Sequence, residues 1–233
     1  MLVLEEKPNS IEAESYRILR TNIQHSSLSS NLRSILVTSA DLEEGKSLVV
    51  SNLALSFAQN GQSVIIVDCN LRKPVINKIF NIPNICGLVE VLSDKNDIKY
   101  TIKEYSKNLY IIPAGTIIEN PSEMLDSYKM NTLIEYLKNK FDIVIIDSPP
   151  LQDVTDAQIL STKVDGTIIV VKCGESKKEN VLDAKDLLDK VGANIIGAVL
   201  NGIATETGNN CSKKKKHIKR KNIKNERKSV ATQ

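Results

Sequence analysis

A run of ten residues from Thr38 to Ser47, T-S-A-D-L-E-E-G-K-S, combines the residue types of a phosphate-binding loop. It follows a run that predicts a strand and precedes a pattern that predicts a helix, as such a loop requires. Free N–H groups and the dipole at a helix N-terminus attract phosphate oxygens. Lys46 suits the β- and γ-phosphates of a nucleotide, and the Ser47 hydroxyl is a hard oxygen ligand for Mg²⁺.

Two aspartates, Asp68 and Asp147, each end an apolar run, VIIVD and IVIID. In parallel α/β sheets, ligands bind beyond the carboxyl ends of the strands. Three strand ends then bring a lysine, a hydroxyl and two carboxylates to one edge, which is the mixture that a metal–phosphate site needs. A single aspartate there would be explained as a helix cap or turn residue, but the pair beside Gly45–Ser47 favours the site.

Six short runs rich in β-branched residues predict the strands that position these groups. Most are continuously apolar, which is typical of strands covered on both faces. The runs are Ser34–Ser39, Val64–Asp68, Leu109–Pro113, Ile143–Asp147, Thr167–Lys172 and Ile195–Leu200. Helical patterns lie near residues 48–58, 128–140 and 181–191. The alternation predicts an α/β fold with a mostly parallel sheet and helices on both faces.

A further helix is expected ahead of the first strand, from about Ser10 to Gln24, with Asn9 and Glu12 as its capping box. At the other end, residues 204–233 are polar and then basic, and we expect a disordered tail. Lys213–Lys228 holds ten Lys or Arg and one Glu, a net charge of +9. This segment is either a solvated extension or an attachment to an anionic surface.

Composition narrows the class of protein. Apolar residues make up 41% and charged residues 25% of 233, as in soluble globular proteins. No apolar run approaches the roughly 20 residues needed to cross a bilayer, and the N-terminus lacks the pattern of a secretion signal. We therefore expect a cytoplasmic protein. Four scattered cysteines without a CxxC pair, and two histidines, predict neither a zinc site nor a disulfide framework.

Several longer motifs are shared with one known family. They are EGKS at Glu44–Ser47, VIIVDCNLRKP at Val64–Pro74, IPAG at Ile112–Gly115, NPSEML at Asn120–Leu125, FDIVIIDSPP at Phe141–Pro150 with Asp156-Ala157, and VLNG at Val199–Gly202. Over about residues 5–203 the chain resembles the cytoplasmic domain of bacterial tyrosine kinases of capsular and exopolysaccharide synthesis. These belong to the deviant P-loop ATPases related to MinD and ParA.

The resemblance implies ATP and Mg²⁺ as ligands, with residues 31–203 as the kinase domain. The implied nucleotide contacts are Glu44, Gly45, Lys46, Ser47 and Asn201. The implied metal-binding residues are Ser47, Asp68 and Asp147, and the implied catalytic residues are Lys46, Asp68, Arg72 and Asp147. In this interpretation Asp68 acts on the metal or as base towards a tyrosine hydroxyl, and Arg72 stabilises transferred charge.

The resemblance also implies assembly. Glu14, Arg17 and Arg20 match the family's E-x-x-R-x-x-R segment, so residues 1–30 are expected to carry a ring-forming helix. Without the resemblance, these residues would be explained by an i,i+3 salt bridge. The implied partner is a transmembrane polysaccharide chain-length or adaptor protein, which places the chain at the inner face of the plasma membrane. Inner-leaflet anionic lipid is then the expected target of Lys213–Lys228, since no groove-reading motif favours nucleic acid.

Several residues depart from the family pattern. Asn70 replaces the second acid of Asp-x-Asp and cannot carry charge, and Leu48 replaces a hydroxyl residue. Ala40 and Glu43 stand where glycines would ease the loop, and Glu43 adds a negative charge near the phosphates. The family's C-terminal tyrosine cluster is missing, because the last of six tyrosines is Tyr136.

Three hypotheses follow. The first is a tyrosine kinase that phosphorylates another protein or an internal tyrosine such as Tyr105 or Tyr128. The second is a nucleotide-dependent assembly switch in polysaccharide export with little kinase activity. The third is a MinD- or ParA-like positioning ATPase. The motifs favour the first two, and the kinase is the prediction tested below.

Overall fold

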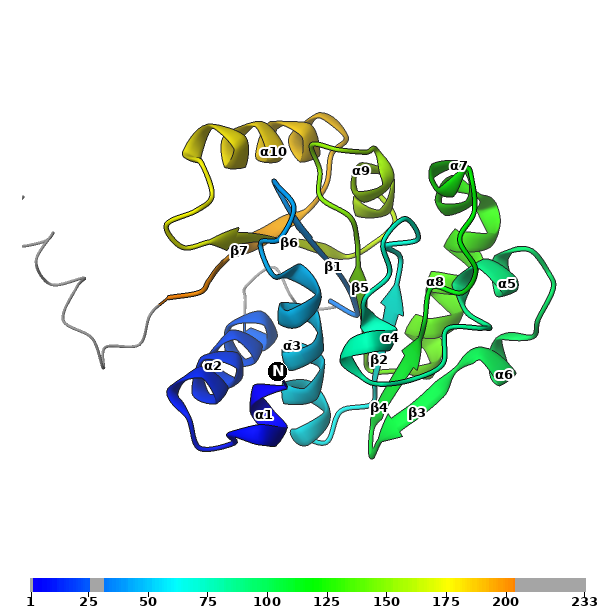
Figure 1. The fold of residues 1–233 in the computed structure, drawn as a ribbon, viewed down its shortest axis with the longest axis horizontal. Coiled ribbons are helices and arrows are strands. Elements are labelled where there is room, and N and C mark those ends of the chain that lie inside the picture. The colour runs from blue at the N-terminus through cyan, green and yellow to red at the C-terminus, as the bar shows by residue number, and fades with distance from the viewer. Residues whose placement is uncertain (1, 26–31, 204–233) are drawn as a thin grey trace, which may run out of the picture. The chain divides into compact units, whose positions relative to one another are not determined.

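A sheet of seven strands forms the centre of the computed structural model, which describes residues 2–25 and 32–203 (Figure 1). The strands are β1 (Ser34–Ser39), β2 (Val64–Asp68), β3 (Lys103–Ser106), β4 (Leu109–Ile112), β5 (Ile143–Asp147), β6 (Gly166–Lys172) and β7 (Ile195–Asn201). Their order is β3-β4-β2-β5-β1-β6-β7, and all neighbours are parallel except β3 and β4. The predicted mostly parallel α/β fold is confirmed.

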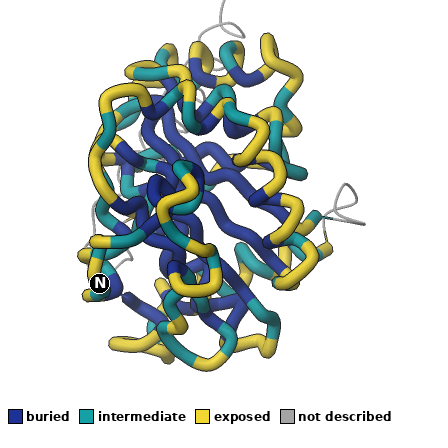
Figure 2. The backbone as a smooth tube through the Cα atoms, turned by 90° about the vertical axis from the view of Figure 1, so that its right-hand side faces the viewer, coloured by how far each residue is buried: buried dark blue, intermediate teal, exposed yellow. Residues whose placement is uncertain are grey.

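Helices cover both faces of this sheet. The helices are α1 (Val3–Glu6), α2 (Ile11–His25), α3 (Lys46–Gln59), α4 (Ile76–Ile79), α5 (Leu88–Leu92), α6 (Ile98–Thr101), α7 (Pro121–Asp126), α8 (Tyr128–Lys140), α9 (Asp156–Ser161) and α10 (Lys178–Lys190). Along β1, Ile35 and Val37 pack in the apolar cluster that α3 joins, whereas Leu36 packs in the cluster that α8 joins. Figure 2 shows the strands as a buried centre beneath helices with exposed outer faces.

The register of the sheet positions the chemistry. β5 lies between β1 and β2, and its last residue, Asp147, is paired with Asp68 of β2 and with Val37 of β1. The carboxyl ends of these three strands therefore meet at one edge. The loop from Ser39 to Gly45 leaves this edge and leads into α3.

The structure corrects some local predictions. Ser10 caps α2, since its hydroxyl accepts a hydrogen bond from Ala13 N at 3.1 Å, so the predicted cap at Asn9 is wrong by one residue. β4 ends at Ile112, before Pro113, because proline has no N–H for the ladder. β3 was missed because a short, polar edge strand lacks an apolar pattern. No helix among residues 2–25 and 32–203 is long and apolar enough to cross a membrane.

Candidate functional site

The loop before α3 has the geometry of a phosphate-binding turn. Gly45 caps the 14-residue helix with a φ of 87°, in the left-handed region that favours glycine. The Asn201 amide donates to the carbonyl oxygen of Glu44 at 3.0 Å. A Cβ on Gly45 would lie 2.2 Å from that amide nitrogen. Backbone conformation and a close neighbour thus both require glycine here.

Glu43 is the strained residue of this loop. Its φ of 59° lies in the left-handed region, although it has a side chain. That conformation costs a non-glycine residue roughly 1–2 kcal/mol. Glu43 also lines the cleft described below. The presence of Glu43 in place of a glycine therefore costs conformational energy in the backbone of this loop.

Glu44 braces the loop from behind. Its carboxylate accepts hydrogen bonds from Asp41 N at 3.1 Å and from the Ser176 hydroxyl, which in turn accepts from Lys172 N at 2.7 Å. Asn180 Nδ2 donates to the Asp41 carboxylate at 2.8 Å. The Glu44 side chain is buried among these groups, and it does not line the cleft. Sequence patterns missed Ser176 and Asn180 because they lie more than 130 residues along the chain from the loop they hold.

Ser47, Asp68 and Asp147 meet at the strand ends as predicted. The Ser47 hydroxyl donates to Asp147 Oδ2 at 2.5 Å. Asp68 accepts hydrogen bonds from Asn70 N at 3.1 Å and from Ile76 N at 3.2 Å. Burial raises the pKa of Asp147 to about 6, and burial together with the neighbouring Asp147 raises the pKa of Asp68 well above its usual range. Two buried carboxylates side by side store unfavourable charge.

Lys46 is buried beside this pair. Burial lowers its pKa, while the carboxylates of Asp147, Glu44 and Asp153 act in the opposite direction. A lysine ammonium with little water around it attracts a phosphate more strongly than an exposed one. The local fold therefore places a weakly solvated cation at the first turn of α3.

The residues present fit a metal–phosphate group. Asp147 Oδ1 is buried without a hydrogen-bond partner in the described part of the chain, and buried polar atoms rarely stay unpaired. No cluster of three or more His, Cys, Asp or Glu among the described residues could hold an ion by itself. Mg²⁺ at phosphate sites uses one or two carboxylates together with substrate oxygens and water. The donor set thus suits Mg²⁺ that arrives with a nucleotide.

A cleft of about 560 Å³ opens over these groups, which suits a small-molecule ligand. Its lining includes Lys46, Ser47, Asn70, Arg72 and Lys73. The polar lining comes from the loop before α3 and the first turn of that helix, from the segment after β2, and from Asp153 after β5. Asn201, predicted to contact the nucleotide, lies behind Gly45 and does not line this cleft.

Arg72 is held at the wall of the cleft by two other elements. Its Nε and Nη2 donate to the two oxygens of Asp156 at 3.0 and 3.2 Å. Ser122 Oγ accepts from Arg72 Nη2 at 3.0 Å and donates to Asp156 Oδ1 at 2.5 Å. Asp156 is fully buried, so the guanidinium is fixed in one bidentate orientation. The sequence motifs contained Asp156 and Ser122 but did not assign this contact.

Comparison with known proteins identifies the family. The model of an AAA domain family matches residues 21–193. Tyrosine-protein kinase YwqD of Bacillus subtilis (strain 168) is 38% identical over 197 residues, 84% of this chain and 83% of the relative. Putative tyrosine-protein kinase CapB of Staphylococcus aureus is 37% identical over 201 residues, 86% and 88% of the two chains. The chain belongs to the bacterial tyrosine kinase family.

Solved structures agree with this assignment. The chimerical protein CapA2B2 superposes with a TM-score of 0.84 at 35% identity, over 88% of this chain and 90% of that chain. The kinase domain of Escherichia coli tyrosine kinase ETK superposes with a TM-score of 0.85 at 29% identity, over 90% and 83%. The predicted P-loop fold and tyrosine-kinase family are confirmed, and this kinase family, like the related P-loop ATPases, binds a nucleotide.

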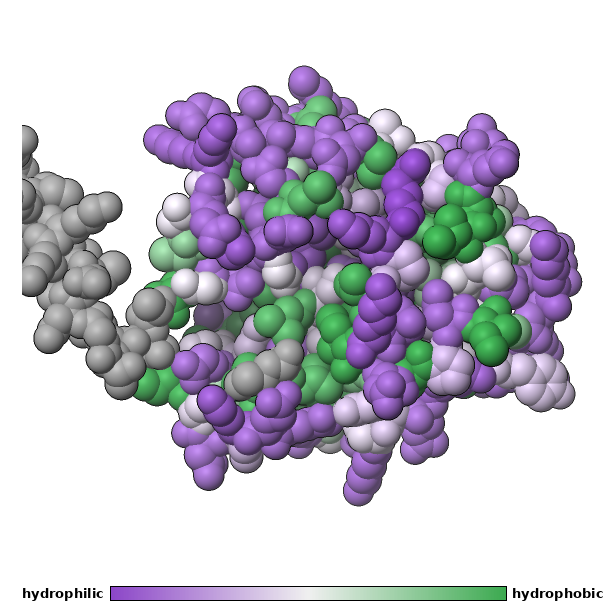
Figure 3. Space-filling model, in the orientation of Figure 1, coloured by the Kyte–Doolittle hydropathy of each residue, from purple (hydrophilic) through white to green (hydrophobic). Residues whose placement is uncertain are grey.

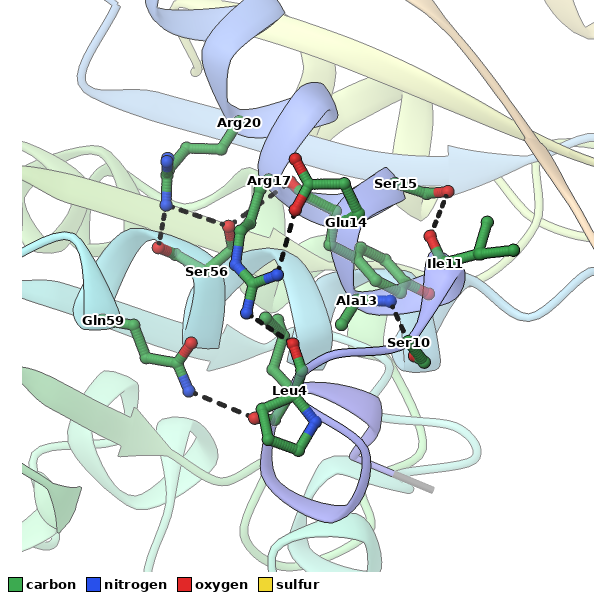
Figure 4. A network of polar contacts seen from close by, with 12 residues as sticks. Leu4, Ser10, Ile11, Ala13, Glu14, Ser15, Arg17, Arg20, Ser56 and Gln59 are labelled. Carbon is green, nitrogen blue, oxygen red and sulfur yellow. Dashed lines mark hydrogen bonds and ion pairs between the residues drawn. The ribbon is translucent and has the colours of Figure 1, made fainter.

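The predicted assembly residues of this kinase make contacts within the chain (Figure 4). Arg17 donates to Glu14 Oε2 at 3.1 Å, which is the i,i+3 pair, and to Pro8 O at 2.7 Å. Arg20 Nη1 donates to the carbonyl of Ser56 in α3 at 2.8 Å and to its hydroxyl at 3.3 Å. The ring-forming role of the motif stays a prediction. The basic segment Lys213–Lys228 lies outside the described residues.

Proposed function

We propose that this protein transfers the γ-phosphoryl group of ATP, bound with Mg²⁺, to a tyrosine hydroxyl of a protein. The observation that carries the proposal is a meeting of four side chains at the ends of three strands. Lys46 and Ser47 line the cleft, and the Ser47 hydroxyl bonds to the buried Asp147, which is paired with the buried Asp68. Membership of the tyrosine kinase family supports the same reaction.

The residues divide the work of positioning and charge neutralisation. The N–H groups at Gly45 and the first turn of α3 receive phosphate oxygens, and Lys46 receives the β- and γ-phosphates. Ser47 and Asp147 hold Mg²⁺, which neutralises charge on the phosphate oxygens when it is bound. The buried Asp68 accepts the proton of the tyrosine hydroxyl. Arg72, fixed by Asp156, stabilises the charge of the transferred group.

Membership of the family supports a proposal for the partner and the location. We propose a transmembrane polysaccharide chain-length or adaptor protein as partner, at the cytoplasmic face of the plasma membrane. A chimera named CapA2B2 among the similar structures supports a functional pairing of kinase with adaptor. Glu14, Arg17 and Arg20 are proposed to support a ring, and Lys213–Lys228 to bind anionic lipid.

The test is phosphorylation with labelled ATP and Mg²⁺, using full-length protein with and without membranes from cells that produce it. We expect label on tyrosine in the wild type and none in Lys46→Met. Lys185→Met is the matched control, because Lys185 lies on the outer face of α10 and pairs only with Asp189 among the described residues. Equal labelling of wild type and Lys46→Met contradicts the proposal.

The assembly switch remains a second candidate because of two observations. Asn70 supplies no second acid, and the last of the six tyrosines is Tyr136. Both departures concern phosphoryl transfer and its acceptor rather than assembly driven by a nucleotide. Calorimetry that finds Mg²⁺-dependent ATP binding, together with no label on any tyrosine, supports the switch.

A further inference from the structure

All six tyrosines of this chain lie among the described residues, so the structure ranks each one as an acceptor. A tyrosine that another copy phosphorylates must leave its own surface and enter a cleft about 560 Å³ in volume. The exposed fraction of the residue is therefore the first criterion. Tyr128 is 81% exposed, Tyr100 67% and Tyr136 38%.

The other three tyrosines are held in packing. Burial raises the pKa of Tyr16 to about 12. The Tyr105 hydroxyl donates to Glu5 Oε2 at 2.9 Å, and its ring lies edge-on to Phe80 at 4.7 Å between centroids. Tyr110 lies in β4 with its ring 5.2 Å from that of Phe141. Phosphorylation of any of these requires its ring packing or its hydrogen bond to be broken first.

The exposed tyrosines differ in their contacts. A lysine ammonium lies 5.3 Å from the ring centre of Tyr100 and another 5.7 Å from that of Tyr136. Each such contact is worth about 0.5–1 kcal/mol at an exposed site. The Tyr128 side chain makes no hydrogen bond, ion pair or ring contact within residues 2–25 and 32–203. Extraction of Tyr128 therefore breaks the fewest interactions.

The surroundings of Tyr128 complement the cleft. It begins α8, one residue after α7, whose Ser122 touches Arg72 at the cleft wall. Figure 1 places α7 and α9 as neighbours, and Figure 3 shows hydrophilic and hydrophobic residues next to one another on the surface where Figure 1 draws α7. Three acids precede the tyrosine within ten residues, namely Glu119, Glu123 and Asp126. The lining of the cleft carries three cations, Lys46, Arg72 and Lys73, and two acids, Glu43 and Asp153, so its net positive charge favours an acidic segment.

We propose that Tyr128 is the tyrosine of this chain that a second copy phosphorylates, in place of a C-terminal cluster. The proposal rests on the proposed function. The Tyr128 oxygen forms a bond to the γ-phosphorus of ATP bound in the other copy, and the bond from that phosphorus to the β,γ-bridging oxygen breaks. ADP leaves with the bonding electrons, and the phenolic proton passes to Asp68 of the copy that holds the ATP.

The first experiment labels full-length wild type, Tyr128→Phe and Tyr100→Phe with ATP and Mg²⁺, with a glutamate–tyrosine copolymer as external substrate. We expect Tyr128→Phe to lose most of its own label and to phosphorylate the copolymer as well as the wild type does. Tyr100→Phe, the matched control, keeps its label. Unlabelled copolymer together with an unlabelled chain contradicts the proposed function. If the copolymer is labelled but the wild-type chain is not, the kinase is active and the assignment of Tyr128 is wrong. The same holds if the copolymer is labelled and Tyr128→Phe keeps its full label.

The second experiment tests transfer between copies. Active Tyr128→Phe is mixed with Lys46→Met, which keeps Tyr128 but cannot supply phosphate. We expect label on the Lys46→Met chain, and none when that chain also carries Tyr128→Phe. Equal labelling of the single and double variants overturns the proposal.

Discussion

The nucleotide cleft and the network around α2 are both built from charged residues, but only the cleft region buries two charges of the same sign side by side. In the cleft, Asp147 keeps an unpartnered buried oxygen beside Asp68, and both carboxylates have raised pKa values. In the α2 network, Arg17 donates to Glu14 and Arg20 Nη1 donates to Ser56, although Arg20 Nε is buried without a partner among the described residues. Two adjacent buried carboxylates therefore indicate a site for a cationic ligand, whereas the contacts of α2 are explained by folding alone until assembly is measured.

The largest effect is expected from Asp147→Asn. This change replaces the charged carboxylate at the metal site with a neutral amide, so Mg²⁺-dependent nucleotide affinity should fall by about 100-fold or more. It also removes one of two adjacent buried charges, so the free energy of unfolding without nucleotide should rise by about 1–2 kcal/mol near pH 7.5. Calorimetry and thermal unfolding measure the two effects. Lost stability and retained affinity would contradict the contrast drawn above.

The pH dependence sharpens this test. The pKa of Asp147 rises from 3.8 to about 6 in the folded protein, so the native state binds more protons than the unfolded chain in that window. Stability of the nucleotide-free wild type should therefore fall as pH rises through the window. Asp147→Asn should show a weaker fall. If the free energy of unfolding depends on pH in the same way for both proteins, Asp147 is not the group responsible for the fall.

A smaller effect is expected from Asp156→Asn. The change keeps a hydrogen-bond acceptor for Ser122 but loosens the bidentate hold on Arg72. Phosphoryl transfer should fall by about 10- to 100-fold, because a positioned charge is lost from the reaction. Nucleotide affinity should change by less than about threefold, since Asp156 does not line the cleft. Arg72→Lys should have the same effects. A loss of nucleotide affinity larger than the loss of transfer would contradict the role of Asp156 in positioning Arg72.

The residues of the α2 network should contribute unequally to the free energy of unfolding. Arg20→Ala removes hydrogen bonds to Ser56 and should lower the free energy of unfolding by about 1 kcal/mol. Glu14→Ala removes only an exposed pair and should cost less than about 0.5 kcal/mol. If Glu14→Ala nevertheless lowers the mass seen by sedimentation, the motif serves assembly beyond folding. If the mass is unchanged in both variants, Glu14 and Arg20 serve the folding of the single chain and not assembly.

The smallest effect is expected from Glu43→Gly. Relief of the left-handed backbone and the added freedom of glycine in the unfolded chain nearly cancel, so stability should change by less than about 0.5 kcal/mol. Loss of the negative charge should raise ATP affinity about threefold, and by less at high salt. Glu43→Gln is the matched control that removes charge and keeps the strain. Equal ATP affinities of the wild type, Glu43→Gly and Glu43→Gln would show that Glu43 does not affect nucleotide binding.

Sequence patterns predicted the centre of this molecule well because buried parallel strands are continuously apolar. Six of the seven strands were predicted from such runs, and so was the meeting of Lys46, Ser47, Asp68 and Asp147. The patterns could not predict contacts that depend on side-chain direction. Glu44 was expected to contact the nucleotide, yet its carboxylate turns towards Ser176.

Short helices were also not predicted from the sequence. α4, α5, α6, α7 and α9 span four to six residues each, too few for a helical period to be visible. The Arg72–Asp156–Ser122 contact joins two of them to the segment after β2, so it lay beyond any local pattern. The same holds for Ser10, whose role as a cap depends on the path of the chain before α2.

The insertion of β5 between β1 and β2 has a consequence for biosynthesis. Ser47 and its partner Asp147 stand 100 residues apart, so a growing chain exposes its glycine-containing turn long before the central strand exists. Contacts of such wide separation form late and slowly during folding. Capture of a fluorescent nucleotide by stalled ribosome–chain complexes should therefore begin only after the segment through Asp147 has emerged, which makes ligand uptake a readout of completed maturation.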